Sequence, residues 1–182
     1  MDFTEKTISS KQIFKGRVIN FKLDTVMLPD GNTAFRELVE HPGGVAVVAV
    51  DDDHNVYFVK QFRKPFEKVL LEIPAGKLEA GEDPLVCGKR ELEEEIGFEA
   101  GNMLYLGDCY PTVGYTNEII RLFLATDLKK THQNLDEDEF LSVTSLHIED
   151  VMNMIMNNEI KDAKTIIGIM KAYTLLKKDN TI

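Results

Sequence analysis

The first half of the chain is patterned as strands separated by turns. A mixed polar and apolar run over residues 12–27 and a second over 33–41 flank the segment 28–32, whose Pro and Asp-Gly residues favour a turn. We therefore expect two strands joined as a hairpin. The run 45–50 is continuous and β-branched, which predicts a strand covered on both faces. Beyond a turn at 51–55, a returning strand is expected over 56–62 and a short one over 70–73.

A helix is expected to open at Asp83-Pro84 and to end at Gly97, because proline suits the first helical turn and glycine suits a helix C-terminus. The predicted inner stripe of this helix is Leu85, Gly88, Leu92 and Ile96. The later elements are predicted to be strands near 103–108, 119–125 and 140–146, then helices over 149–157 and 163–177, the first with the apolar face Val151, Met152, Ile155 and Met156. Helices packed on a mixed sheet indicate an α/β or α+β fold.

Composition indicates a soluble globular protein. The 182 residues are 43% apolar and 29% charged, which suits one compact domain. The longest apolar run, 43–50, is far too short to span a bilayer, and the polar N-terminus has no secretory signal pattern. Cys87 and Cys109 make neither a disulfide framework nor a zinc spacing. We expect no membrane partner and a reducing, cytoplasmic location.

The net charge of −10 argues against a nucleic-acid partner, because binding a phosphate backbone requires a basic surface. If the substrate is itself an anion, arginines or bound metal ions must supply positive charge locally.

The predicted helix carries a candidate metal site. Glu91, Glu94 and Glu95 stand at i, i+3 and i+4 and therefore share one helix face, where three carboxylates repel each other unless cations neutralise them. Hard cations such as Mg²⁺ bind oxygen ligands, and the carbonyl of Ala75 would be another. The alternative is a solvated acidic face on which Arg90 and Glu94 form a simple ion pair.

The whole string from Gly76 to Phe98, GKLEAGEDPLVCGKRELEEEIGF, resembles the Nudix box, G-x5-E-x7-R-E-U-x-E-E-x-G-U, where U is bulky and aliphatic. Leu92 meets the first apolar position, and Phe98 meets the second loosely. A chance match at every fixed position is less than about one in a million at ordinary residue frequencies. The resemblance implies the family's α/β/α sandwich with a mixed sheet. The fixed positions are held by Gly76, Glu82, Arg90, Glu91, Glu94, Glu95 and Gly97.

Features outside the box resemble the ADP-ribose pyrophosphatase branch of this family. The segment 71–76 is similar to its E-x-P-A-G lead-in, in which the alanine carbonyl is a metal ligand; here that residue is Ala75. The segment 110–118 is similar to the loop that reads the terminal ribose, which assigns Gly114 and Glu118 to substrate binding. Val113 replaces the usual proline of that loop, so other nucleotide sugars stay open.

The same resemblance suggests the remaining site residues. An acidic run at 135–139, otherwise read as a solvated loop, is similar to the loop that supplies the water-activating glutamate, here Glu139 with Glu137 in reserve. Arg90 is grouped with these catalytic residues. Arg36 and Arg63 match arginines that hold phosphates or adenine, and an ion pair with a nearby acid is the alternative for Arg36.

The resemblance implies Mg²⁺-dependent hydrolysis of ADP-ribose to AMP and ribose 5-phosphate, with Mn²⁺ as an alternative metal. The other hypotheses are a hydrolase of another nucleoside diphosphate sugar or a dinucleotide, and a Nudix module that senses a nucleotide without cleaving it. Residues 1–42 are expected to form a strand-rich segment that pairs two subunits in a homodimer, and residues 43–182 to form the catalytic domain.

Overall fold

The computed structural model describes residues 2–135 and 139–178 of the chain. Backbone contacts divide the chain into two compact units. The first comprises Met1–Gly43 and Tyr110–Ile119, and the second comprises Gly44–Cys109 and Ile120–Ile182. The loop that was expected to read ribose therefore belongs to the same unit as the N-terminal strands.

The first unit is a three-stranded antiparallel sheet of β1 (Lys6–Lys15), β2 (Asn20–Met27) and β3 (Thr33–Glu40), in that order. The hairpin of β2 and β3 confirms the turn predicted at 28–32. The single strand predicted over 12–27 is wrong. A turn closed by the Gly16 N–H and the Ile19 carbonyl (3.0 Å) splits this run into β1 and β2.

The 110–119 segment is attached to β3 by backbone hydrogen bonds. The N–H of Val39 donates to the carbonyl of Tyr115 (2.7 Å), and the N–H of Asn117 donates to the carbonyl of Val39 (3.3 Å). The Asn117 side chain also accepts from the N–H of His41 at 2.9 Å. This loop is thus ordered by pairing with the strand-rich segment.

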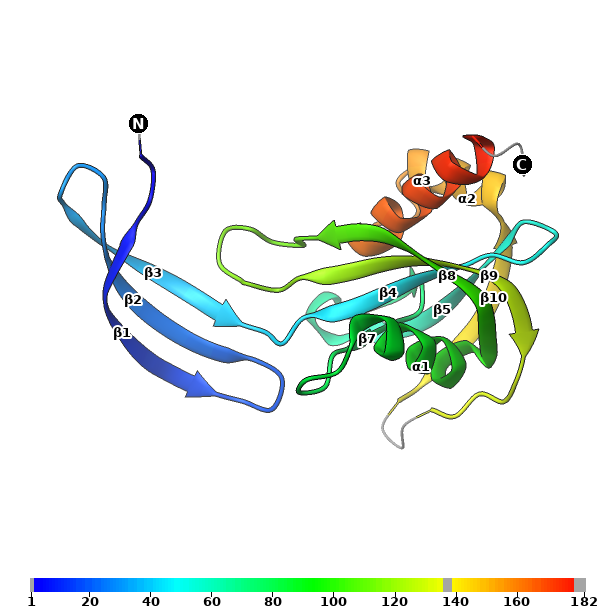
Figure 1. Cartoon of the computed structure of the whole chain (residues 1–182), viewed down its shortest axis with the longest axis horizontal. Helices are drawn as coiled ribbons and strands as arrows, with labels where there is room; N and C mark the ends of the chain where they lie inside the picture. The colour runs from blue at the N-terminus through cyan, green and yellow to red at the C-terminus, as the bar shows by residue number, and fades with distance from the viewer. Residues whose placement is uncertain (1, 136–138, 179–182) are drawn as a thin grey trace. The chain divides into compact units, whose positions relative to one another are not determined.

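The second unit contains two sheets (Figure 1). The first has the order β7-β4-β9-β8, where β4 (Gly44–Ala49) is parallel to β9 (Ile120–Lys130), and β7 (Ala75–Lys77) and β8 (Phe98–Cys109) are antiparallel to their neighbours. Every residue of β4 is buried, which confirms the prediction of a strand covered on both faces.

The second sheet has the order β10-β5-β6, made of β10 (Leu141–His147), β5 (Asn55–Arg63) and β6 (Lys68–Glu72). A short 3₁₀ helix, Lys64–Phe66, connects β5 to β6. β5 was expected to return alongside the strand at 45–50. Instead it meets that segment only at a bridge between Val50 and Val56, and it then departs into this other sheet.

Helices cover both faces of β4. A Cβ added to Gly88 of α1 (Pro84–Ile96) would lie 3.5 Å from the Val47 side chain, whereas one added to Gly168 of α3 (Ala163–Lys178) would lie 2.9 Å from that of Val48. Consecutive strand residues point to opposite faces, so α1 and α3 lie on opposite sides of the sheet (Figure 1). This is the expected α/β/α layering. α2 (Ile148–Met156) packs against α3.

The ends of α1 are as predicted, but its buried stripe is shifted. Asp83 caps the N-terminus by accepting from the N–H groups of Leu85 and Val86, and Gly97 ends the helix with a φ of 70°. Leu85 was predicted to face inward and is 38% exposed, because the helix turns Cys87 toward the sheet instead. On α2, Val151 and Ile155 are buried as expected, whereas Met156 is 74% exposed. No helix in residues 2–135 and 139–178 is long and apolar enough to cross a membrane.

Candidate functional site

The start of α1 is organised around one arginine. Arg90 donates from Nε to Glu82 (3.0 Å) and from Nη1 to Glu94 (2.8 Å), and its Nη1 also lies 2.8 Å from a Glu91 oxygen. The hydrogen bond from Arg90 lowers the pKa of Glu82 to about 2, with help from the Glu79 N–H. The pair of Arg90 and Glu94 considered from the sequence does form, but as part of this larger network of four charged side chains.

Glu91 lies against β7, the short strand that precedes the helix. Its side chain is 12% exposed, and burial raises its pKa to about 7, with the charges of Glu94 and Glu139 adding to the effect and Arg90 opposing it. A Cβ at Gly76 would lie 1.8 Å from the Glu91 carboxyl group. A larger residue at position 76 would therefore displace the Glu91 carboxyl group.

Glu95 is the most deeply buried carboxyl group of the helix, at 2% exposure. Burial raises its pKa to about 8; the N–H of Ala75 opposes this rise, and the charges of Glu139 and Glu91 add to it. That N–H donates to Glu95 Oε2 at 2.8 Å. The N–H of Val47 donates to the carbonyl of Pro74, so these two residues form a hydrogen-bonded pair of the β4–β7 ladder. Hydrogen-bonded and non-hydrogen-bonded pairs alternate in an antiparallel ladder, so the next pair, Ala46 and Ala75, exchanges no backbone hydrogen bonds. The Ala75 carbonyl is thus left outside the β4–β7 ladder.

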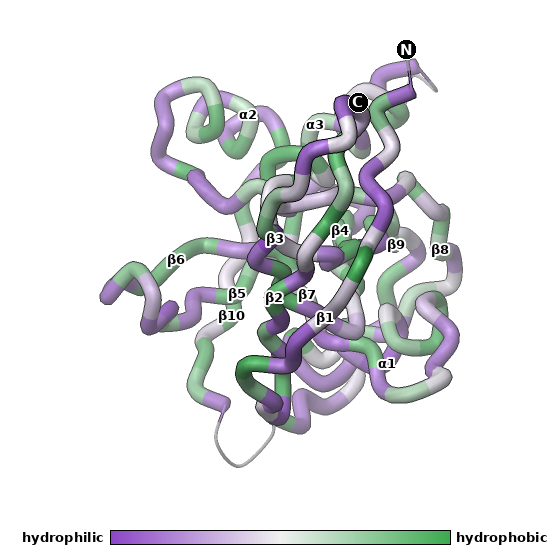
Figure 2. The backbone as a smooth tube through the Cα atoms, turned by 90° about the vertical axis from the view of Figure 1, so that its left-hand side faces the viewer, coloured by the Kyte–Doolittle hydropathy of each residue, from purple (hydrophilic) through white to green (hydrophobic). Residues whose placement is uncertain are grey.

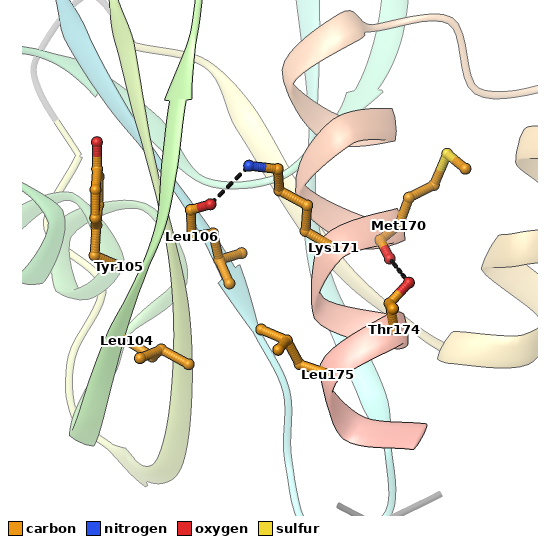
Figure 3. A pocket seen from close by; sticks show the side chains of 7 residues that line it. All are labelled: Leu104, Tyr105, Leu106, Met170, Lys171, Thr174 and Leu175. Carbon is orange, nitrogen blue, oxygen red and sulfur yellow. Dashed lines mark hydrogen bonds between the residues drawn. The ribbon is translucent and has the colours of Figure 1, made fainter. Parts of the chain in front are cut away.

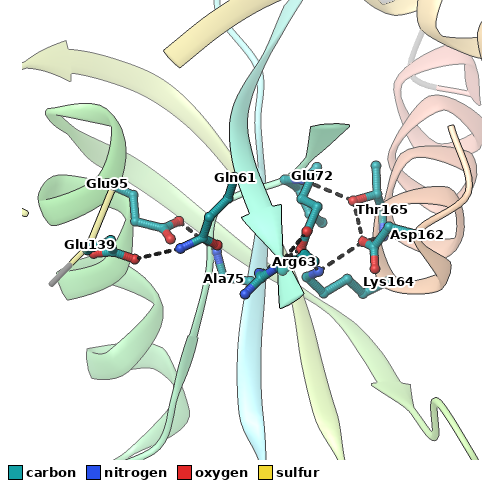
Figure 4. A network of polar contacts seen from close by, with 10 residues as sticks. Gln61, Arg63, Glu72, Ala75, Glu95, Glu139, Asp162, Lys164 and Thr165 are labelled. Carbon is teal, nitrogen blue, oxygen red and sulfur yellow. Dashed lines mark hydrogen bonds and ion pairs between the residues drawn. The ribbon is translucent and has the colours of Figure 1, made fainter. Parts of the chain in front are cut away.

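Glu139 lies two residues before β10, close enough to Glu91 and Glu95 to affect the pKa of both. The Gln61 amide of β5 is turned toward Glu139 and donates to its Oε1 at 3.3 Å (Figure 4). The helix α1, the strand β5 and the segment before β10 thus bring these groups together, from positions up to 78 residues apart in the chain. Glu137, the reserve candidate for the base, lies outside the described residues.

A second charged network adjoins β5. Arg63 donates from Nε (2.6 Å) and Nη2 (2.8 Å) to the two oxygens of Glu72, which is 2% exposed. Lys164, at the start of α3, donates to the same Glu72 carboxylate and to Asp162 at 3.0 Å. Burial alone would raise the pKa of Glu72, but its contacts with Arg63 and Lys164 hold it below the usual value. The sequence patterns gave no functional role to Glu72, which lies in the lead-in motif, and they did not indicate Lys164.

The other predicted substrate-binding residues belong to the first unit. Arg36 donates from Nε to Glu5 at 2.8 Å, so the ion pair proposed as its alternative is present. Glu118 lies 3.5 Å from the Nδ1 atom of His41. Gly114 has open space around its Cα, since an added Cβ would meet nothing within 4 Å. The substrate roles of these three residues remain predictions.

An apolar hollow of about 590 Å³ lies elsewhere in the second unit, between β8 and α3 (Figure 3). Leu104, Leu106, Met170 and Leu175 line it, and the Lys171 ammonium beside them donates to the Leu106 carbonyl at 2.7 Å. It has no carboxylate in its lining and shares no residue with the cluster on α1, so it is not the candidate site.

The donor set around α1 fits Mg²⁺. It consists of hard oxygens: the carboxylates of Glu91, Glu94 and Glu95 and the carbonyl of Ala75. Among the described residues, no three acidic, histidine or cysteine side chains form a ready-made cage for an ion. Mg²⁺ does not require one, because it keeps several waters and completes its shell with substrate phosphates. Burial and mutual repulsion raise the pKa values of Glu91 and Glu95, and a cation bound between them would stabilise their charged forms.

Comparisons with known proteins identify the family of the chain. The sequence profile of the NUDIX domain family matches residues 40–167. The chain is 46% identical over 169 residues to the methanol dehydrogenase activator of Bacillus methanolicus, covering 92% of this chain and 91% of that protein. It is 45% identical over 176 residues to the ADP-ribose pyrophosphatase of Bacillus subtilis (strain 168), covering 96% and 94%.

A more distant relative carries a different substrate in its name. The GDP-mannose pyrophosphatase of Yersinia enterocolitica is 31% identical over 183 residues, covering 92% of this chain and 93% of that protein. Among solved structures, one described as an ADP compounds hydrolase superposes with a TM-score of 0.88 over 100% of both chains at 18% identity. At that identity the likeness concerns the fold.

Proposed function

Because the chain belongs to the Nudix hydrolase family, we propose that it hydrolyses the pyrophosphate of ADP-ribose to AMP and ribose 5-phosphate, with Mg²⁺ as cofactor and Mn²⁺ as a substitute. The observation that carries this proposal is the cluster of Glu91 and Glu95 with Glu139. These carboxyl groups come from two distant parts of the second unit and lie within electrostatic reach of each other. The choice of substrate is supported by an ADP-ribose pyrophosphatase that is 45% identical to this chain and is matched over 94% of its own length.

In this proposal Glu91, Glu94, Glu95 and the Ala75 carbonyl hold the metal ions. Bound Mg²⁺ neutralises pyrophosphate charge and lowers the pKa of the attacking water. Glu139 accepts a proton from that water, while the amide of Gln61 orients the Glu139 carboxylate. The water oxygen forms a new bond to one phosphorus, and the bond from that phosphorus to the bridging oxygen breaks. Arg63 binds a phosphate oxygen, the Arg90 network keeps Glu91 and Glu94 in place, and the Ala75 N–H holds Glu95.

The 46% identity to a methanol dehydrogenase activator favours a second candidate function, in which the chain stimulates a dehydrogenase. A third hypothesis, nucleotide sensing without cleavage, is disfavoured because none of the box glutamates is replaced. We also propose a cytoplasmic location, in keeping with two buried free thiols, and no nucleic-acid or membrane partner, given the net charge of −10.

We further propose a homodimer formed through the first unit. All ten residues of β1 are exposed, among them Ile8, Ile13 and Phe14, and Phe35 of β3 is 69% exposed. Figure 2 shows hydrophobic positions interspersed along these strands. A small sheet that leaves such side chains open gains stability by packing them against a partner, and a second copy of the sheet offers an equally apolar surface.

The substrate proposal is tested by assaying products with Mg²⁺ on a panel of nucleotides. We expect ADP-ribose to be hydrolysed faster than UDP-glucose, GDP-mannose or any nucleoside triphosphate. A preference for a triphosphate of about tenfold or more, equivalent to about 1.4 kcal/mol of barrier, would contradict the assignment to ADP-ribose while leaving the family unaffected.

A further inference from the structure

A buried chain of charges connects the first turn of α3 to Arg63, outside the carboxylate cluster of α1 (Figure 4). Lys164 is 9% exposed and Glu72 is 2% exposed. Removing two such charges from water is costly, and core residues of similar size would often pack at least as well. A role beyond packing would explain why ions occupy these positions.

The geometry shows what this chain of charges controls. Arg63 uses Nε and Nη2 to grip both oxygens of Glu72, which fixes the plane of its guanidinium group. Its Nη1 atom takes no part in this grip, and the side chain is 37% exposed. One edge of Arg63 is therefore anchored in the protein while the other remains accessible to a ligand.

Lys164 determines the charge that this ligand meets. Glu72 and Asp162 contribute two negative charges, which Arg63 and Lys164 balance. Without the charge of Lys164, the group would carry a net negative charge, and Arg63 alone would have to neutralise Glu72. Because Coulomb interactions are strong at a poorly hydrated site, that change would weaken the attraction of Arg63 for an anion.

Hydrogen bonds from α3 also hold the segment that carries Glu72. Thr165 Oγ1 accepts from the N–H of Ile73 at 3.0 Å and donates to Asp162 at 2.6 Å. The first turn of α3 thus holds both the side chain of Glu72 and the backbone that follows it.

We propose that Lys164 is a positioning residue. It acts through Glu72 to orient Arg63 and to preserve the attraction of Arg63 for a diphosphate oxygen of the substrate. This inference rests on the proposed function of Arg63 in substrate binding.

The test is the variant Lys164→Met, which keeps the length of the side chain and removes its charge. Binding of ADP-ribose and of inorganic pyrophosphate to the metal-free protein is measured by calorimetry, together with KM and kcat in Mg²⁺. We expect Kd and KM to rise on the order of tenfold, as for the loss of other outer partners of a binding group, with kcat nearly unchanged. Lys171→Met is the matched control, since it removes a lysine of the same helix whose ammonium donates to the Leu106 carbonyl and not to the Glu72 network, and it should change neither constant.

Two further variants separate positioning from general destabilisation. Lys164→Arg, which keeps the charge, should bind more like the wild type than Lys164→Met does. In an Arg63→Ala background, Lys164→Met should have no further effect on Kd, because residues acting through one another are not additive. An equal loss in both backgrounds, an equal loss in Lys164→Arg, or no loss in Lys164→Met would overturn the inference. If the wild type binds pyrophosphate but neither binds nor cleaves ADP-ribose, the proposed substrate fails while the pyrophosphate measurements still decide the role of Lys164.

Discussion

At the scale of single residues, the three glutamates on one face of α1 occupy different environments. Glu95 is 2% exposed and Glu91 12%, whereas Glu94 is 33% exposed. Burial raises the pKa of Glu95 to about 8 and that of Glu91 to about 7. Without a cation, the two buried groups therefore tend to keep a proton near neutral pH. A metal ligand must be deprotonated, so metal binding has to displace these protons.

Replacing Glu95 with Gln should abolish most of the activity while preserving the fold. We expect the rate to fall by at least about 100-fold, which is more than the roughly 10- to 100-fold typical of an outer-sphere partner. The Mg²⁺ concentration for half-maximal rate should also rise. Steady-state assays over a range of Mg²⁺ concentrations measure both effects. Unchanged activity and Mg²⁺ dependence would mean that Glu95 is not a ligand.

The pH dependence of the stability of the same variant tests whether folding raises the pKa of Glu95. A carboxyl group whose pKa is raised from 4.5 to about 8 on folding favours the folded state at low pH, and this contribution is lost as pH rises through that window. The metal-free wild type should thus lose stability between about pH 5 and pH 8, and Glu95→Gln should lose less. Thermal unfolding followed by circular dichroism tests this, and added Mg²⁺ should restore the wild type at pH 8.

Glu139→Gln should behave differently, because it removes a base and keeps the metal ligands. A general base accelerates a reaction by roughly 10²- to 10⁴-fold, so kcat should fall by about that factor. KM and the Mg²⁺ dependence should stay close to those of the wild type. If kcat is largely retained, another residue activates the water, with Glu137 the next candidate.

At the scale of elements, α1 carries both the packing and the chemistry of the site. Gly88, Leu92 and Ile96 are buried against the sheet, while the carboxylates project along the side that meets β7 at Gly76. The position of the helix therefore determines the spacing between its glutamates and the Ala75 backbone. Its N-terminal cap, Asp83, contributes to that position without touching the carboxylates.

Asp83→Ala should lower the free energy of unfolding by about 1 kcal/mol, because the N–H groups of Leu85 and Val86 lose their acceptor. Denaturant unfolding measures the change. Asp83→Asn is the control and should cost much less, since asparagine caps helices nearly as well. The Mg²⁺ dependence of both variants should resemble that of the wild type. Equal destabilisation by Ala and Asn would show that the cap contributes little.

At the scale of the whole molecule, the sheet of the first unit has too little internal core to account for its stability. In β1 no residue is buried, and in the sheet as a whole Asp24 and Val26 of β2 are the buried residues described. A sheet of this kind requires another surface to pack against.

We expect light scattering at micromolar concentration to give twice the mass of the 20.6 kDa chain. The residues 12–27 and 33–41 should lie in the interface, so Phe35→Asp should shift the protein toward the monomer by burying an unpaired charge there. Met156→Asp, at an equally exposed position of α2, should leave the dimer intact. A fully active wild-type monomer would contradict this prediction.

Local sequence signals were sufficient for the parts of this protein that depend on local interactions. The limits of α1 follow from Asp83, Pro84 and Gly97, because caps act within one turn. The box spacing identified the family and the carboxylate face, since helical geometry alone places i, i+3 and i+4 together. Where packing takes part, the same reasoning was incomplete: it put Leu85 inside and joined β1 and β2 into one strand.

Only the tertiary structure decided which groups meet across long separations. Lys164 reaches Glu72 over 92 residues, and Gln61 reaches Glu139 over 78. It also decided that Glu95 is buried while Glu94 remains partly exposed, although both belong to the same face of one helix. Burial and pKa depend on what the rest of the chain packs around a side chain. That environment is a property of the folded molecule, and no pattern of neighbouring residues contains it.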